Sequence, residues 1–273
     1  MKKAVEQLKS IARWLIVLLL LFSVFCQVED FWVRGKPGQE ATAFAPLLMP
    51  GLQARGQVTH RSWFPFYIRD TEISLFSRRS GRWRFEGTLL ERRQGLSSEI
   101  RLFRMDANTL PRFTPPNIRG KPESKEAAVW MALEEMPPHA RVRFSFSTRH
   151  PVSPEGLLDM LSPYRLRVEW MPIWEASGPH LAHPLGIPAG EEGGITPTNL
   201  PKRRSLLMET LGEQSRPVKW LGETFDPAHH RQLLASGPLR VYGAVVEGSV
   251  EEILRLRGLL ELRHPEIIDT GLH

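Results

Sequence analysis

The stretch RVYGAVVEGSVEEILRLR, residues 240–257, predicts a strand followed directly by a helix. The β-branched residues of Arg240–Glu247 favour the strand. Ser249 and Glu252 have the spacing of a capping box, in which a serine and a glutamate three residues later satisfy free amide groups where a helix begins. Gly258 is a typical stop signal just after such a helix. The 18 residues therefore supply the strand and helix of a β-α-β unit.

A similar pattern precedes this stretch. In Arg141–Thr148, apolar and polar side chains alternate as in a strand with one buried face. Ser153 caps a short helix, and Leu166–Trp174 supplies the next strand. Leu262–Asp269 can close the second unit as an edge strand. Two β-α-β units within residues 123–273 predict an α+β fold with a ferredoxin-like domain, in which the helices cover one face of the sheet.

Gly243 lies inside the strand between Tyr242 and Val245. Glycine normally weakens a strand, because it packs no side chain and loses more chain entropy on folding. Its presence in such a β-branched run predicts that another backbone or a helix approaches closely at this point.

The part before residue 123 divides into three regions. Residues 58–122 are β-like, since Thr71–Ser77 and Arg82–Glu91 carry apolar residues at strand spacing. Residues 34–57 are rich in Gly, Pro, Gln and Ala, which indicates a juxtamembrane linker.

The N-terminal region contains the uncharged run WLIVLLLLFSVFCQV, residues 14–28. With its flanking residues this run approaches the roughly 20 apolar residues that a bilayer requires. The sequence therefore predicts a transmembrane helix over residues 14–33. The residues expected to anchor it in lipid are Trp14, Leu15, Leu18, Phe22, Cys26 and Val28.

The charges around this run predict its orientation. Four cations precede the run and two acids follow it, so residues 1–13 are expected in the cytoplasm and the rest outside the cell membrane. A cleaved signal peptide is the main alternative, although Ala41-Thr42-Ala43 lies far from the apolar run. A lipoprotein anchor at Cys26 and a buried helix of a globular protein are weaker alternatives.

Arginines are concentrated in the β-like region next to the predicted membrane helix. They are expected either to cover a solvated sheet face or to contact an anionic lipid or wall polymer. The candidates for such contact are Arg78, Arg79, Arg82, Arg84, Arg92 and Arg93. The net charge of +6 is compatible with nucleic acid, but the predicted topology keeps this region away from it.

No sequence motif indicates catalysis or a cofactor. The pairs His180/His183 and His229/His230 have neither a cysteine nor a carboxylate at a usual metal-ligand spacing. There is no nucleophile elbow, phosphate-binding loop or zinc-protease motif. The sequence therefore predicts no enzyme, no cofactor, no metal site and no small-molecule substrate.

Several segments resemble the C-terminal domain of membrane-bound sigma factor regulators, the anti-sigma proteins of Gram-positive bacteria. Val241–Gly248 and Glu251–Leu256 are similar to the signature near the end of that domain. Leu133–Pro137 with Val142–Ser147 resembles its first helix and strand, and Leu157–Trp170 resembles the next pair. The resemblance covers about half of the chain.

The resemblance implies a membrane-anchored regulator that senses or binds a partner outside the cytoplasm and controls a sigma factor. The 13 residues before the apolar run are too few to fold alone, which needs roughly 40. Output is therefore expected through residues 1–13 or through a second membrane protein. The alternative is an extracytoplasmic binding or structural module with no role in transcription.

Overall fold

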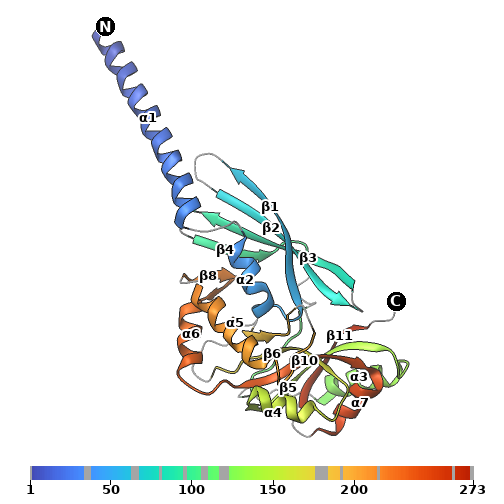
Figure 1. The fold of residues 1–273 in the computed structure, drawn as a ribbon. Coiled ribbons are helices and arrows are strands. Elements are labelled where there is room, and N and C mark those ends of the chain that lie inside the picture. The colour runs from blue at the N-terminus through green and yellow to red at the C-terminus, as the bar shows by residue number, and fades with distance from the viewer. Residues whose placement is uncertain are drawn as a thin grey trace.

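The protein has an α+β fold with one six-stranded and one five-stranded sheet, and helices pack against them. Figure 1 shows its computed structural model. The structure describes residues 2–33, 38–62, 68–79, 82–94, 97–105, 110–116, 123–175, 184–190, 193–213, 216–259 and 262–270. Helix α1 (Lys2–Val33) extends away from both sheets, which are formed by the rest of the chain.

The first sheet has the strand order β1-β2-β3-β4-β8-β9. Its strands are β1 (Leu52–Ser62), β2 (Ile68–Arg79), β3 (Arg82–Gln94), β4 (Ser97–Leu102), β8 (Val218–Trp220) and β9 (Glu223–Phe225). All its pairs are antiparallel except β4 with β8. In β2, buried and half-exposed residues alternate, because successive side chains of a strand point to opposite faces. One face of this sheet therefore packs on the core.

The second sheet is antiparallel, with the order β11-β5-β10-β6-β7. Its strands are β5 (Arg141–Val152), β6 (Arg167–Pro172), β7 (Gly186–Pro188), β10 (Val241–Ser249) and β11 (Leu262–Thr270). Helices α3 (Glu123–Glu134), α4 (Pro154–Leu161) and α7 (Val250–Arg255) pack against it. The predicted caps Ser153 and Ser249 are confirmed, since each hydroxyl accepts a hydrogen bond from a helix amide group. The Glu252 carboxylate accepts a hydrogen bond from the Arg165 amide group.

Helix α2 (Gln39–Leu48) lies where the two sheets meet. Phe44 packs edge-on against Phe225 of β9, with ring centroids 5.0 Å apart. The Trp170 indole of β6 donates a hydrogen bond to the Pro46 carbonyl at 3.1 Å. The same helix thus contacts both sheets. Helices α5 (Leu200–Glu213) and α6 (Pro227–Ala235) lie beside it.

The linker predicted for residues 34–57 is corrected by this helix. Ala41, Phe44, Ala45 and Leu48 have helical spacing and are buried. The segment folds because its apolar face is covered by the sheets, which its Gly, Pro and Gln content did not indicate. Strand β1 then begins at Leu52, within the predicted linker.

The predicted transmembrane helix over residues 14–33 is also corrected. Among the described residues, no helix is both long and apolar enough to cross a bilayer.

The predicted ferredoxin-like domain over residues 123–273 is wrong as well, because the two sheets do not match it. This part of the chain does not fold as one separate sandwich. Its strands β8 and β9 complete the first sheet, and β7 adds a fifth strand to the second. The segment between β6 and β10 that forms these strands also forms α5 and α6.

Candidate functional site

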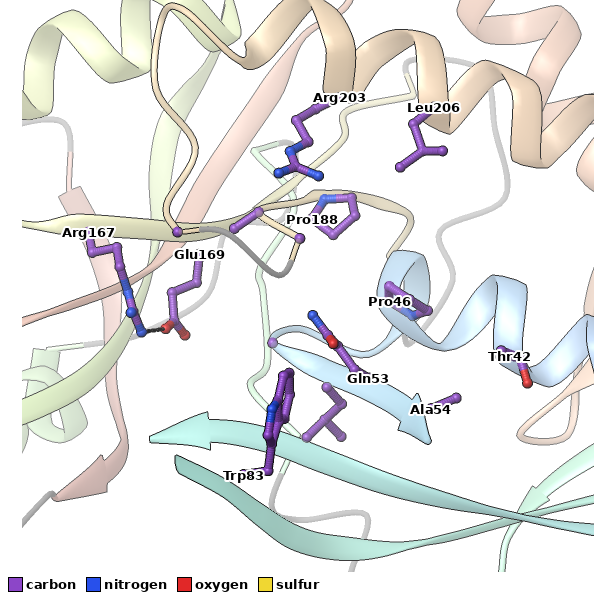
Figure 2. A pocket seen from close by; sticks show the side chains of 15 residues that line it. Thr42, Pro46, Gln53, Ala54, Trp83, Arg167, Glu169, Pro188, Arg203 and Leu206 are labelled. Carbon is purple, nitrogen blue, oxygen red and sulfur yellow. Dashed lines mark hydrogen bonds and ion pairs between the residues drawn. The ribbon is translucent and has the colours of Figure 1, made fainter. Parts of the chain in front are cut away.

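A pocket of about 340 Å³ lies at the junction of the two sheets. Figure 2 shows that its walls come from α2, the beginning of β1, the end of β7, α5 and Trp83 of β3. The size is at the lower end of the range for small-molecule sites and suits a few side chains. Segments that are far apart in sequence build it, so it exists only in the folded chain.

Two strand edges face this pocket. The lining includes four consecutive residues, Gly51–Ala54, and three consecutive residues, Pro188–Gly190. Successive side chains of a strand point to opposite faces, so a pocket lined by consecutive residues faces the edge of the strand. Strand β1 ends the first sheet and β7 ends the second, and each pairs with one neighbour among the described strands. Of the lining residues, Leu52–Ala54 belong to β1 and Pro188 belongs to β7. The Leu52 and Ala189 amide groups already donate to the Met49 and Glu169 carbonyls, so the edges present their other backbone groups to the pocket.

Arg203 in the first turn of α5 is the one arginine of the pocket for which the described residues offer no ion-pair or hydrogen-bond partner to the guanidinium. Its Nε atom is buried. Gly190 makes room for the guanidinium, because a Cβ at that position would lie 2.1 Å from Arg203 Nη1. Gly190 also has a φ of +79°, which glycine adopts at little cost. The local backbone thus holds an unpaired cation against the pocket.

Glu169 of β6 supplies a negative charge, but this charge is already compensated. Its carboxylate accepts hydrogen bonds from Arg143 Nε and Arg167 Nη2, both at 2.5 Å. Burial acts to raise the pKa of Glu169, while Arg143 and Arg167 act to lower it, and the net result is a lowered pKa. Arg167 also binds Glu247 of β10. Glu169 is therefore ionised and held within a network of the second sheet.

Trp83 forms the wall of the pocket on the side opposite Arg203 (Figure 2). The guanidinium carbon of Arg55 lies 3.5 Å from the Trp83 ring centroid, a close cation–π contact. Leu206 and Pro46 add apolar surface between these residues. The pocket thus combines an aromatic ring, a small apolar wall and a guanidinium that the described part of the chain leaves without a partner.

A buried charged cluster lies under the beginning of α2. Arg93 Nε is 2.5 Å from Glu91 Oε1, and Arg93 Nη2 is 3.5 Å from Glu40 Oε1. The Ala41 amide group donates a hydrogen bond to Glu91 Oε2 at 3.2 Å. Burial raises the pKa of Glu91, with Glu40 adding to the effect and Arg93 opposing it. The cluster fixes the first turn of α2 on the first sheet.

The structure separates the six candidate arginines for an anionic surface. Arg84 is exposed, and exposed Arg92 forms an ion pair with Asp70 at 2.8 Å. Arg93 belongs to the buried cluster under α2. The side chains of Arg78, Arg79 and Arg82 lie outside the described residues. Contact with an anionic surface stays a prediction.

The expected anchor residues lie on α1. Trp14, Leu15, Leu18 and Phe22 have exposed side chains, with Trp14 69% exposed. The side chains of Cys26 and Val28 lie outside the described residues.

The histidines noted in the sequence occur in different settings. His180 and His183 lie outside the described residues. His229 and His230 are in α6, where His230 is buried, stacks on Phe225 and lies 2.7 Å from a carboxylate oxygen of Glu175. The buried histidine thus joins α6 to the segment that follows β6 through the Glu175 carboxylate.

Sequence reasoning missed the three residues that define the pocket, Trp83, Glu169 and Arg203. A glutamate inside the strand pattern RVEWMP was the one usable signal, because a charged residue in a covered strand normally has a partner. Arg203 is one of three consecutive cations, Lys202–Arg204, and nothing in the sequence singles it out.

Comparisons of the chain with protein-family models, with curated proteins and with solved structures found no match.

Proposed function

We propose that this chain is a regulatory binding protein of the anti-sigma type, which engages a partner at the pocket between its two sheets. The observation that supports this function best is the Arg203 guanidinium, which has no partner among the described residues and lies at a pocket bordered by two strand edges. Arg203 is half-buried with its Nε atom enclosed, and a carboxylate ligand would add a charge-assisted hydrogen bond that the described residues do not supply. The arrangement suits binding, and the proposal includes no catalytic role.

Helix α2 gives such a site a way to affect the rest of the molecule. Thr42 and Pro46 of α2 line the pocket. The same helix is tied to the first sheet through Glu91 and to the second through Trp170. Helix α1 precedes it in the chain. A partner that moves α2 therefore changes the contacts of both sheets. The movement can also reach α1, which ends only a few residues before α2 begins.

The sigma factor enters this proposal through the sequence resemblance of Val241–Gly248 and Leu157–Trp170 to sigma factor regulators. The partner at the pocket can be the sigma factor itself or a second regulatory protein of the membrane. The competing proposal is a binding module outside the cytoplasm with no role in transcription. The pocket serves both, so transcription has to be measured.

Transcript sequencing in the native bacterium tests the regulatory role. Deleting the gene should raise the transcripts of one class of promoters, those read by a single alternative sigma factor. A copy with Arg203→Ala should fail to restore normal levels, whereas a copy with Lys202→Ala should restore them, because Lys202 is an exposed neighbour on the same helix. Unchanged transcripts after deletion would leave the binding module as the better proposal.

The location outside the cytoplasm also stays a proposal. A reporter enzyme that is active only outside the cytoplasm, fused after Leu52, should be active. Activity of a cytoplasm-specific reporter at the same position would contradict this location.

A further inference from the structure

We infer that the pocket takes an extended peptide in which acidic and apolar side chains alternate, bound as an added strand at the edge of β1. This inference rests on the proposed partner-binding function and specifies the chemistry of the partner.

The charges select an acidic ligand. Arg143 and Arg167 already compensate Glu169, and Arg167 also binds Glu247. Arg203 has no such partner among the described residues. A carboxylate can take two parallel hydrogen bonds from a guanidinium, which gives both charge neutralisation and a defined orientation. A cationic ligand would leave two positive groups together at low dielectric.

The strand edges select an extended backbone. Gly51–Ala54 and Pro188–Gly190 present consecutive residues to the same space. A strand rises about 3.3 Å per residue, so an added segment of three residues would match the length of Leu52–Ala54, the three lining residues that belong to β1. Pro188 has no amide hydrogen and the Leu52 amide group already donates to the Met49 carbonyl, so the amide groups that follow Leu52 in β1 have to supply the hydrogen-bond donors for such a segment. Added strands gain affinity from these backbone hydrogen bonds and specificity from the side chains.

The two walls of the pocket differ in chemistry, which favours a peptide in which acidic and apolar side chains alternate. In Figure 2, Arg203 and Trp83 reach the pocket from opposite sides, with the end of β7 and the beginning of β1 between them. Neighbouring side chains of an added strand would point in opposite directions. One would face the Arg203 guanidinium, and the next would face the Trp83 ring and its apolar surroundings. An acidic residue next to an apolar one satisfies both walls.

Fluorescence anisotropy with the purified full-length chain in detergent tests this inference. The probe is a fluorescein-labelled peptide, acetyl-Val-Glu-Val-Glu-Val-Glu. It should bind wild type, and Arg203→Ala should weaken binding by about tenfold or more, the effect of losing a charge-assisted hydrogen bond. Arg203→Lys should retain part of the affinity. Lys202→Ala removes the same charge from an exposed neighbour and should bind like wild type. Equal melting temperatures of the variants would exclude unfolding as the cause.

Three altered ligands separate the parts of the inference. A peptide with glutamine in place of every glutamate should bind much more weakly, and equal binding would overturn the acidic requirement. A peptide with two central prolines lacks two backbone amide donors at its centre and should lose binding, whereas equal binding would overturn strand addition. Free indole-3-propionate offers a carboxylate and a ring without a peptide backbone. If it displaces the probe at concentrations similar to the unlabelled peptide, the pocket is a small-molecule site and the peptide inference is wrong.

These results stand apart from the transcript experiment. If Arg203→Ala changes transcript levels but no peptide binds, the peptide inference fails and the regulatory proposal remains. If the peptide binds as described but deletion leaves transcripts unchanged, the inference holds for a binding module without a role in transcription.

Discussion

The two sheets bury different kinds of surface. In the second sheet, β10 buries six consecutive residues, Val241–Val246, of which only Tyr242 carries a polar group. In the first sheet, the buried residues of β2 and β3 include Arg69, Glu91 and Arg93. Apolar burial stabilises without fixing a direction, whereas buried ion pairs require defined positions of their partners. The charged groups buried in the first sheet therefore fix where α2 begins on it, whereas strand β10 of the second sheet is held by apolar packing.

The largest expected effect concerns the apolar sheet. Gly243→Val should destabilise the full chain by about 3 kcal/mol, because overpacking of a tight core has this order of cost. A Cβ at Gly243 would lie 2.2 Å from the Phe146 carbonyl oxygen of β5, so the backbone itself would have to move. Gly258→Ala is the matched control, because a Cβ there has open space. A denaturant midpoint for Gly243→Val equal to that of wild type would contradict the close packing of β5 and β10.

The close approach at Gly243 was predictable from the sequence, as were the strand of β10 and the cap Ser249. Each depends on residues within a few positions of one another. Helix α2 was not predictable, because its apolar face becomes meaningful only against Phe225 and the sheets. The three-residue strands β8 and β9 carry too few residues for a periodic pattern. The pocket brings α2 and β1 together with β7 and α5, which are distant in sequence, so only Glu169 had a signal in advance, its charge within a strand.

The second-largest effect concerns the ionised carboxylate of the second sheet. Glu169→Gln should cost about 2 kcal/mol at neutral pH, because Arg143 and Arg167 lose their shared partner. The pKa of Glu169 is lowered from its ordinary value of 4.5, so its stabilisation is present above about pH 4.5 and is lost as the pH falls through the lowered pKa. The difference between variant and wild type should therefore shrink in acid. Urea melts at several pH values measure it, with exposed Glu209→Gln as the control.

Glu91 of the first sheet should show the opposite pH dependence and a smaller effect. Its pKa is raised above 4.5, chiefly by burial, so its contribution is full below about pH 4.5 and is lost as the pH rises through the raised pKa. Glu91→Gln resembles the protonated form and should cost less than about 1 kcal/mol at neutral pH. Relative to wild type, the variant should gain stability as the pH rises from 4 to 7. A variant that instead loses stability over this range would show that the ion pair with Arg93 outweighs burial.

The smallest effect is expected at the pocket. Arg203→Ala should change the free energy of unfolding by less than about 0.5 kcal/mol, since no ion pair or hydrogen bond to its guanidinium exists among the described residues. Substitution of a residue that stabilises the fold lowers the free energy of unfolding, whereas substitution of a residue that only binds a ligand leaves it nearly unchanged. Glu169 is paired on both sides and should be costly to replace, whereas Arg203 borders the same pocket and should not be.

The measurement is a pair of urea melts, with and without saturating acidic peptide. Without peptide, Arg203→Ala and Lys202→Ala should both match wild type. With peptide, wild type and Lys202→Ala should gain stability, because a ligand that binds only the folded state shifts the equilibrium toward it, and Arg203→Ala should gain much less. A loss of several kcal/mol in Arg203→Ala without peptide would mean that the guanidinium stabilises the fold, and Arg203 would then belong with Glu169 as a structural residue.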